Sequence, residues 1–504
     1  MHLNTDYFLH DPVQELESAA SKPSEMRKTT PEGYIEILPN RLYWTAVNST
    51  PRPTSQYHFF CIDQDLVYEP FNQDFGPLNL SCTFKFARLV KKLLDDPSLS
   101  KKKLVHYCSL SEKKRPNAAY LMCCFQVMYL NKPAELAYRP FENIRPQFQP
   151  FRDATAGMCT YACTVLDCVK GLEYAMKINW FNPETFNVQA YDYYEKVDNG
   201  DISWVIPEKF LAFSGPSGNG IDTYGYPAFT PEDYVPIFRN ANVSTVVRLN
   251  KEQYDAARFT MNGIKHVDMF FPDGSCPPRD IVNRFLRLAE SEPAALAVHC
   301  KAGLGRTGTL IGLYAQKHYK FPGRAYIGWN RIARPGAILG PQQQYLCDME
   351  REMIALGEQE RATKGLNGRN LPSVSGSGAS NSLNAGAALR SLTAAEKKED
   401  VGQGERLVAA KAKQGAGAGA LTAKSSISAN LQAKLTSNVS VGGTGSYINR
   451  LTGSEISFSR FSPGLSSSSS PMKLLGQKRS DSRPIMKGMF GPQGQRPVRL
   501  SSNN

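Results

Sequence analysis

The chain has 504 residues, of which 41% are hydrophobic and 10% aromatic, and this is enough to build the cores of two or three domains. It has no signal-peptide pattern at Met1 and no apolar run long enough to cross a bilayer, so we expect a soluble intracellular protein with no membrane partner. The net charge of +13 is concentrated in residues 361–504, which hold 20 Lys and Arg against 6 Asp and Glu. Residues 1–360 are therefore close to neutral, which argues against nucleic-acid binding by the folded part.

The first part of the chain is predicted to form strands and then helices. Alternating apolar residues predict strands at Tyr34–Leu38, Tyr43–Val47 and Tyr57–Ile62. A helix follows, and its apolar face consists of Phe86, Leu89, Val90, Leu93 and Leu94. The next segment, LVHYCSLSEKKRPNAAYL from Leu104, is a short strand, a polar loop and a helical pattern.

The second part alternates more regularly between strands and helices. Strands are predicted at Thr245–Leu249, Val267–Phe271 and Ala295–His299, and helices at Pro278–Glu290 and Thr307–Tyr319. This order favours a largely parallel sheet flanked by helices, an α/β fold. In such sheets a ligand binds beyond the carboxyl ends of the strands. The segment HCKAGLGRTG, from His299 to Gly308, is predicted to lie there.

The two parts contain related segments. When they are aligned on His106 and His299, Tyr107 takes the place of Cys300, and the loop glycines of the second segment are missing from the first. We interpret this as two related α/β domains in tandem, the first of which has lost the chemistry of the second.

The tail is rich in Gly, Ser, Ala, Asn and Lys, and it is predicted to be disordered. It contains Ser-Pro pairs at Ser462 and Ser470, which proline-directed kinases could phosphorylate, and the basic run Gln477–Arg483, a candidate nuclear address. Such a tail could also bind regulators. The alternative is a solvated tail with scattered charge.

The loop after His299 has the composition of an oxyanion site with a nucleophile. Its glycines let the backbone curl around a ligand, and the helix that follows adds positive potential. We expect the loop residues Lys301, Ala302, Gly303, Leu304 and Gly305 to bind phosphate through backbone N–H groups. Arg306 could grip two phosphate oxygens, and Cys300 at the base, as a thiolate, could attack phosphorus.

Other readings of the same segment fit less well. A Walker A loop needs Gly-x4-Gly-Lys-[Ser/Thr], which is absent here. A zinc site needs several ligands at regular spacing, and Cys159, Cys163 and Cys168, the best alternative, are predicted to be core cysteines on a helix. The chemistry predicted for Cys300 needs neither a metal nor a cofactor.

Thiolate attack requires an acid that protonates the leaving oxygen. Asp273, in FFPDGSCPP at the end of the preceding predicted strand, is the candidate, and it could then activate water. A simple Pro-Asp-Gly turn is the alternative. Thr307 could hydrogen-bond the Cys300 sulfur or cap the helix, and His299 could orient the loop through a backbone carbonyl or simply be a buried core histidine.

These motifs resemble the cell-division-cycle fourteen family of dual-specificity protein phosphatases over about residues 30–355. The similarity rests on five segments: HYCSLSEKKRPNAA at 106–119, KFLAFSGP at 209–216, FPDGS at 271–275, HCKAGLGRTG at 299–308 and GPQQQYL at 340–346.

The resemblance implies two tandem phosphatase-like domains joined by a linker helix, of which only the second is active. The expected division is an extension (1–30), an inactive domain (31–182), an acidic linker helix (183–201), a catalytic domain (202–358) and a disordered basic tail (359–504). The resemblance also implies that Cys300 is the nucleophile, Arg306 the phosphate ligand and Asp273 the general acid.

The resemblance also implies a substrate and the residues that select it. Gln342 and Gln343 would position water, and Asp192, Glu195 and Asp201 would line an acidic groove between the domains. The expected partners are phosphoproteins with a phosphoserine or phosphothreonine followed by proline and a basic residue, as made by cyclin-dependent kinases. The expected places are the nucleus and cytoplasm, with the nucleolus, spindle and spindle pole as further candidates. As a bare sequence, the acidic cluster could equally be a solvated helix face.

Two other functions stay open at this point. A phosphoinositide phosphatase typically has a second loop lysine where this chain has Leu304, and the acidic segment near Asp192 would repel a polyanionic head group. A phosphoprotein-binding scaffold is disfavoured by the presence together of Cys300, Arg306 and Asp273.

Overall fold

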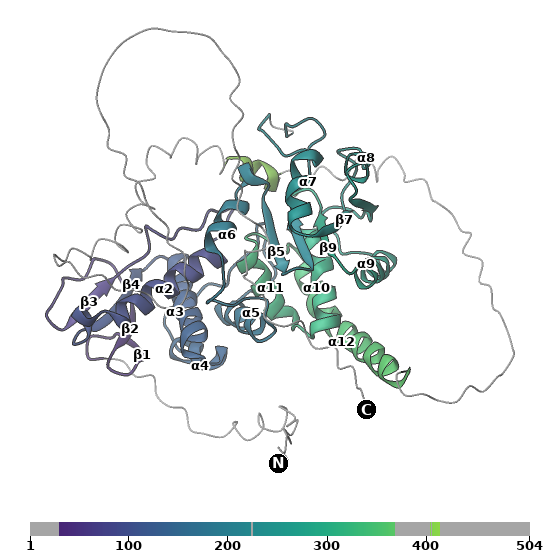
Figure 1. Cartoon of the computed structure of the whole chain (residues 1–504). Coiled ribbons are helices and arrows are strands. Elements are labelled where there is room, and N and C mark those ends of the chain that lie inside the picture. Colours follow the sequence, from purple (N-terminus) through teal and green to yellow (C-terminus); the bar gives the residue numbers. More distant parts are fainter. Residues whose placement is uncertain (1–29, 223–224, 368–403, 405, 414–504) are drawn as a thin grey trace, which may run out of the picture.

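The computed structural model describes residues 30–222, 225–367, 404 and 406–413, and these form two α/β units and a short separate helix (Figure 1). The strands of the N-terminal unit are β1 (Ile35–Leu38), β2 (Leu42–Val47), β3 (Tyr57–Phe60) and β4 (Lys103–Ser109). Its helices are α2 (Leu80–Asp95), α3 (Lys114–Leu130), α4 (Ala134–Tyr138) and α5 (Val165–Lys177), with the 3₁₀ helices η1 (Pro97–Leu99) and η2 (Arg139–Phe141).

The C-terminal unit follows α6 (Val188–Tyr194) and the 3₁₀ helix η3 (Val197–Asn199). Its strands are β5 (Ile202–Ile206), β6 (Phe210–Phe213), β7 (Val243–Arg248), β8 (Lys265–Asp268) and β9 (Ala295–His299). Its helices are α7 (Pro231–Asn240), α8 (Ala257–Thr260), α9 (Arg279–Ser291), α10 (Gly305–Tyr319), α11 (Gly323–Ala333) and α12 (Pro341–Asn367). The predicted strands and helices are present, although β8 ends at Asp268, earlier than the predicted Phe271.

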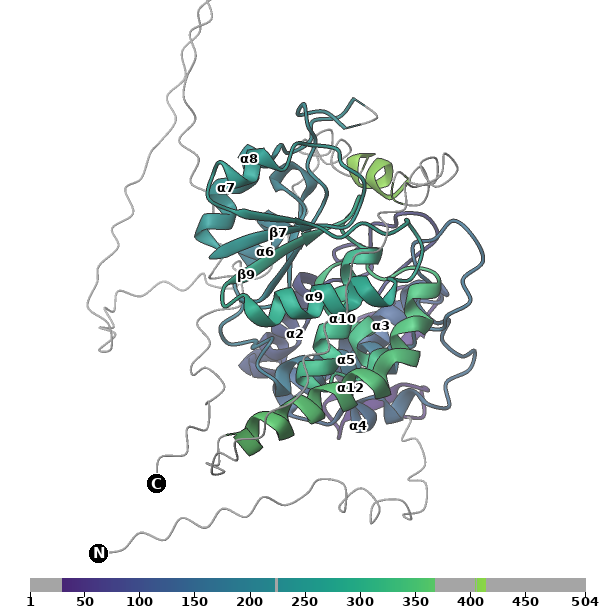
Figure 2. The ribbon, with the colours of Figure 1, turned by 90° about the vertical axis from the view of Figure 1, so that its right-hand side faces the viewer.

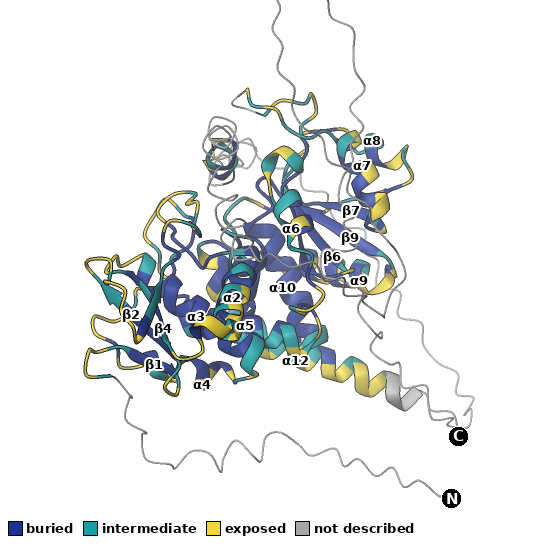
Figure 3. Cartoon of the chain, turned by 60° about the vertical axis from the view of Figure 1, so that its left-hand side comes forward, coloured by how far each residue is buried: buried dark blue, intermediate teal, exposed yellow. Residues whose placement is uncertain are grey.

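The two sheets have the same arrangement of strands. In the described residues the orders are β1-β2-β4-β3 and β5-β6-β9-β7-β8. Each begins with an antiparallel pair and continues with parallel pairs, and β4 and β9 hold the corresponding central positions. Figure 3 shows β7 and β9 as buried, and Figure 2 shows α9, α10 and α12 as a group of helices below β7 and β9 in that view. This shared topology supports the tandem duplication and confirms the largely parallel α/β fold.

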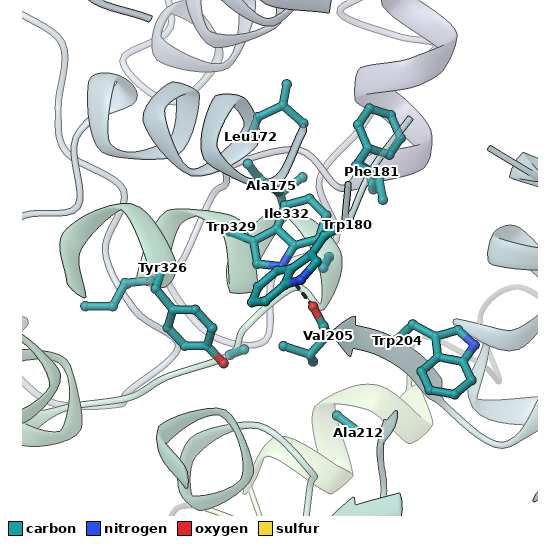
Figure 4. Close-up of a cluster of buried hydrophobic side chains, with 14 of the residues drawn as sticks. Leu172, Ala175, Trp180, Phe181, Trp204, Val205, Ala212, Tyr326, Trp329 and Ile332 are labelled. Carbon is teal, nitrogen blue, oxygen red and sulfur yellow. Dashed lines mark hydrogen bonds between the residues drawn. The ribbon is translucent and has the colours of Figure 1, made fainter. Parts of the chain in front are cut away.

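A continuous buried core joins the two units through α5 and α11. The helices approach closely because each has a glycine at the contact: a Cβ atom on Gly171 would lie 2.4 Å from the Ala325 carbonyl oxygen, and one on Gly328 would lie 2.6 Å from that of Asp167. Trp180 and Trp329 fill the space beside them, and Trp329 Nε1 donates to Val205 O at 3.0 Å (Figure 4). The two units are thus packed like parts of one core rather than as loosely tethered modules.

The helical part of the linker is shorter than the predicted helix at 183–201. Asn187 caps α6 by accepting from Ala190 N at 2.9 Å. Gly200 and Asp201 both have positive φ angles, of 105° and 49°, which a continuing helix does not allow. The acidic linker is therefore α6, then η3, then a turn that ends at Asp201.

The tail is ordered where it is described, which corrects the prediction of disorder from residue 359. Helix α12 continues to Asn367, and residues 406–413, called the tail helix below, are helical (yellow-green in Figure 1). The remaining predicted tail, with Ser462, Ser470 and Gln477–Arg483, lies outside the described residues, as do residues 1–29 of the extension. Among the described helices, none is both long and apolar enough to cross a membrane.

His106 on β4 corresponds to His299 of the second unit, and its surroundings in the first unit are different. It is fully buried between Phe60 and Phe86, and neither ring nitrogen has a hydrogen-bond partner in the described structure. Burial lowers the pKa of His106 to about 3, against about 6.5 in an unfolded chain. The unfolded state therefore binds more protons between these values, and the stability that comes from the neutral ring is lost as the pH falls from about 6.5 towards 3.

We predict that His106→Phe stabilises the protein, because it removes two buried polar atoms that have no partner. Urea unfolding at pH 7 should show a gain of about 1 kcal/mol. The gain should increase between pH 6.5 and pH 4.5, since the variant has no ring to protonate on unfolding. A variant that is less stable, or whose advantage is the same at both pH values, would contradict this account of His106.

Candidate active site

The loop from Cys300 to Leu304 connects the central strand β9 to the first turn of α10. Cys300 is buried, with 3% of its surface exposed, at the carboxyl end of the strand. Gly303 has φ +65°, and a Cβ atom there would lie 1.9 Å from Phe213 O, so a glycine is required at that position. The backbone thus turns sharply enough to return to the helix N-terminus within a few residues.

Each carbonyl of this loop is bonded on its outer side. Cys300 O accepts from His299 Nδ1 at 2.8 Å, and Lys301 O accepts from Gly215 N at 2.8 Å. Arg334 donates to Ala302 O at 3.2 Å and to Gly303 O at 2.7 Å, and Leu304 O accepts from Gly308 N at 3.1 Å. Because the carbonyls point outward, the N–H edge of the loop faces its centre, where an oxyanion would bind.

His299 is held in the tautomer that this arrangement needs. Burial lowers its pKa to about 3, so the ring is neutral at physiological pH and carries one proton. Nδ1–H donates to Cys300 O, which leaves Nε2 to accept from the Tyr254 hydroxyl at 2.8 Å. Tyr254 in turn accepts from His266 Nε2, 2.9 Å away. The predicted orientation of the loop by His299 through a backbone carbonyl has this geometry.

Arg306 and Asp273 lie beside the loop, as their predicted roles require. The Arg306 side chain is buried in the first turn of α10, and Nη1 donates to Phe271 O at 2.9 Å. Nη2 is 3.2 Å from Asp273 Oδ1, and Asp273 follows β8 on the neighbouring loop. The structure therefore brings Cys300, Arg306 and Asp273 to one edge of the sheet, although they are up to 33 positions apart in sequence.

Two of the predicted polar side chains, those of Thr307 and Gln342, lie beside the loop. Thr307 Oγ1 is buried and makes no hydrogen bond in the described structure, so neither the predicted bond to the Cys300 sulfur nor a helix cap is formed. Gln342 donates to Ser275 O at 2.9 Å, and its Oε1 faces Gly305, 2.6 Å from where a Cβ atom would be. Two buried polar atoms without a partner, Thr307 Oγ1 and Gln342 Oε1, thus border the loop.

Gln343 corrects the prediction of two water-positioning glutamines. Its side chain donates to Asp153 Oδ2 at 2.9 Å and accepts from Arg331, which places it between the two units and away from the loop. Consecutive residues on a helix point about 100° apart, so only one of the pair can face the site. Of these two, Gln342 is the glutamine beside the loop, and its role in positioning water stays a prediction.

The three predicted groove acids are close together but have different partners. Asp192 pairs with Lys85 at 2.7 Å, and Glu195 accepts from Asn79 at 3.0 Å. Burial raises the pKa of the Glu195 carboxyl, and the charges of Asp192 and Asp201 add to the increase. Asp201 is buried and bonded to Arg334. The three carboxylates therefore form an acidic region in which Asp192 and Asp201 make ionisation of Glu195 less favourable.

A cavity of about 780 Å³ begins at this acidic region and extends to the loop. Asp201 is the only one of the three predicted acids that lines it. Its other lining residues include Asp198, Tyr226, Phe229 and Lys301. Asp198 was missed because it is one of several acids in a short acidic run, with no periodicity to distinguish it.

Arg334 is the other residue that the sequence did not reveal. Its guanidinium donates to the carbonyls of Ala302 and Gly303 and also to Asp201, both the backbone oxygen at 3.0 Å and the carboxylate. It therefore joins the phosphate-loop backbone directly to the acidic cavity. No sequence signal could have found it, since an arginine before Pro-Gly is an ordinary turn pattern.

Comparisons with known proteins show which families this chain resembles. Residues 36–175 match the family described as the N-terminal half of dual specificity protein phosphatases, and residues 219–319 match a DSP-PTPase phosphatase family of polymorphic toxin systems. Dual specificity protein phosphatase CDC14A of Mus musculus is 47% identical over 68% of this chain and 57% of its own length. CDC14C of Homo sapiens is 43% identical over 69% of this chain and 77% of its own length. The crystal structure of Tk-PTP in its active form aligns with a TM-score of 0.26 at 19% identity, covering 30% of this chain and 97% of its own.

The fold and site define a cysteine-based phosphatase of the dual-specificity class, with two phosphatase-like domains in tandem. Within that class, the chain belongs to the CDC14 family, as its identity to CDC14 proteins over more than two thirds of their length shows. The chain aligns with little more than half the length of the CDC14A relatives. Its activity and substrates are therefore treated below as proposals.

We predict that Arg334→Lys lowers kcat for phosphate-ester hydrolysis by about tenfold to a hundredfold, because a lysine cannot hold two loop carbonyls and a carboxylate at once. Steady-state kinetics with para-nitrophenyl phosphate would measure this. Arg324→Lys is the matched control, since Arg324 also pairs with a carboxylate, that of Asp167, but far from the loop. An Arg334→Lys variant with unchanged kcat would show that the loop keeps its shape without these bonds.

Proposed function

We propose that this protein is a phosphatase that hydrolyses phosphoserine, phosphothreonine and phosphotyrosine in proteins through a cysteinyl-phosphate intermediate. The observation that carries the proposal is the loop whose five carbonyls, from Cys300 to Leu304, are all bonded on the outside. A ring of inward N–H groups with Arg306 at its end binds a dianion, and Cys300 lies at its base. Membership in the CDC14 family supports the same conclusion.

The proposed reaction has two steps that use the same groups. In the first, the Cys300 thiolate attacks phosphorus, the bond from phosphorus to the substrate oxygen breaks, and Asp273 donates its proton to that oxygen. In the second, Asp273 removes a proton from water as the water attacks the phosphocysteine, and the thiolate leaves. Gln342, which lies between the loop and Ser275, is placed to orient that water.

The acidic cavity supports a preference for a basic residue after the phosphorylated one. Asp198 and Asp201 line it, and their negative charges would favour a lysine or arginine of the substrate. We therefore propose substrates of the form phosphoserine or phosphothreonine, then proline, then a downstream basic residue. Removing these phosphates would oppose cyclin-dependent kinases during cell division, in the nucleus and cytoplasm.

We predict that a Ser(P)-Pro-x-Lys peptide is hydrolysed with a kcat/KM at least about tenfold higher than that of a Ser(P)-Ala-x-Ala peptide. One charge-assisted contact between the lysine and the acidic cavity is strong enough to give a difference of this size. Phosphate release by the full chain would measure it. Cys300→Ser should abolish hydrolysis of both, while Asp273→Asn should reduce kcat without removing substrate binding.

Different results would favour different functions. Equal rates on the two peptides would keep the chemistry but remove the proposed specificity. Hydrolysis of soluble phosphoinositides with no activity on phosphopeptides would make the protein a phosphoinositide phosphatase instead. Binding of phosphopeptides without any hydrolysis would indicate a scaffold.

A further inference from the structure

The tail helix forms part of the wall of the cavity that the proposed substrate would use. Val408, Lys411 and Ala412 line the cavity together with Asp201 and Lys301. Leu407 and Ala412 are buried, with 3% and 7% of their surfaces exposed, so one side of the helix packs against the domains. The opposite side carries the exposed Lys413. A segment about forty positions beyond the end of α12 therefore returns to the front of the site.

Lys411 occupies the acidic end of the cavity. Its ammonium donates to the Asp201 carboxylate and lies 5.7 Å from the centre of the Phe71 ring, so it is held by the linker on one side and by the N-terminal unit on the other. Burial lowers the pKa of Lys411 to about 8, with Arg334 adding to the decrease and Asp201 opposing it. A cation is enclosed here only because the carboxylates around it offset its desolvation.

Gly404 lies at the phosphate loop, at the other end of the segment. Its backbone N donates to Asp273 Oδ2 at 2.6 Å, and its Cα is beside Lys301, since a Cβ atom would lie 2.9 Å from Lys301 Cβ. This bond uses an oxygen of the proposed general acid as an acceptor, at the side chain that would have to reach the leaving group of a substrate. The segment thus contacts both the catalytic edge and the acidic pocket.

We propose that residues 404 and 406–413 act as an intramolecular ligand of the substrate groove, with Lys411 in the place of the substrate's basic residue, and that the docked segment inhibits the enzyme by competition. The inference rests on the proposed function for the identity of the competitor, a basic phosphopeptide. The segment has no part in the proposed reaction, and its departure opens the route to Cys300. A substrate must therefore displace the segment. The apparent affinity for substrate is the affinity of the open groove multiplied by the fraction of molecules in which the groove is free.

The first test measures access to Cys300 and needs no substrate. The full chain is treated with iodoacetamide, and the alkylation of Cys300 is followed by mass spectrometry. Lys411→Glu places a negative charge against Asp201 and should release the segment, raising the alkylation rate several-fold. Lys413→Glu is the matched control, because it makes the same charge change on the same helix at an exposed position, and its rate should be that of the unaltered chain. Leu407→Asp, which disrupts the apolar contact instead, should behave like Lys411→Glu.

The second test measures competition directly. With Ser(P)-Pro-x-Lys as substrate, Lys411→Glu should lower KM by about tenfold and leave kcat nearly unchanged, while Lys413→Glu changes neither. A synthetic peptide with the sequence of residues 402–415 should inhibit Lys411→Glu competitively, and the same peptide carrying Lys411→Glu should not.

The two tests separate failure of this inference from failure of the proposed function. If no phosphopeptide is hydrolysed by any variant but Lys411→Glu still accelerates alkylation, the segment covers the site and the proposed substrate is wrong. If alkylation is equal in the unaltered chain, Lys411→Glu and Leu407→Asp, residues 404 and 406–413 do not restrict the site and the inference is overturned, whatever the chain hydrolyses. A rise in KM in Lys411→Glu would overturn it as well, since the segment would then assist binding.

Discussion

The site depends on one constraint: every carbonyl of the loop between β9 and α10 must find a partner outside the loop. A buried backbone oxygen without a hydrogen bond costs about 1–3 kcal/mol, so the loop could not keep its N–H edge inward if these partners were absent. They come from His299, Gly215, Arg334 and Gly308, that is, from four different segments of the C-terminal unit. The catalytic loop is thus shaped by the fold around it rather than by its own glycines alone.

The same constraint explains why the two histidines of the repeated segments differ. His299 has a donor role to Cys300 O and an acceptor role from Tyr254, and both ring nitrogens are satisfied. His106 holds the corresponding place on β4, yet its ring packs between phenylalanines and bonds to nothing in the described structure. The histidine of the first unit therefore orients no carbonyl in the described structure, and it contributes through the packing of its ring.

The sequence predicted what depends on local pattern and motif. The strand at Ala295–His299 and the grouping of Cys300, Arg306 and Asp273 follow from alternation and from the rule that parallel strands bring their carboxyl ends together. Arg334 could not be predicted, because it bonds to backbone oxygens of the loop and to Asp201, and only the tertiary structure brings these groups near it. The tail helix was missed for a similar reason. The sequence RLVAAKAK is too short to show a period above its Gly-rich and Ala-rich surroundings, and its contacts with Asp201 and Phe71 are with residues 210 and 340 positions away.

Asp201, at the acidic end of the cavity, is held in place in a strained backbone conformation. Asp201 has φ +49°, a left-handed conformation that is unfavourable for most residues but relatively accessible to aspartate. Arg334 holds both the backbone oxygen and the carboxylate of Asp201, so the strained turn and the direction of the charge are set by the same guanidinium that holds Ala302 O and Gly303 O. A cation that binds Asp201, whether Lys411 or a substrate side chain, therefore contacts a carboxylate that is linked to the Cys300–Leu304 loop through one side chain, that of Arg334. The proposed recognition of a basic residue and the proposed phosphate site would in this way belong to one hydrogen-bonded unit, and a longer glutamate at position 201 would not place its carboxylate in the same geometry.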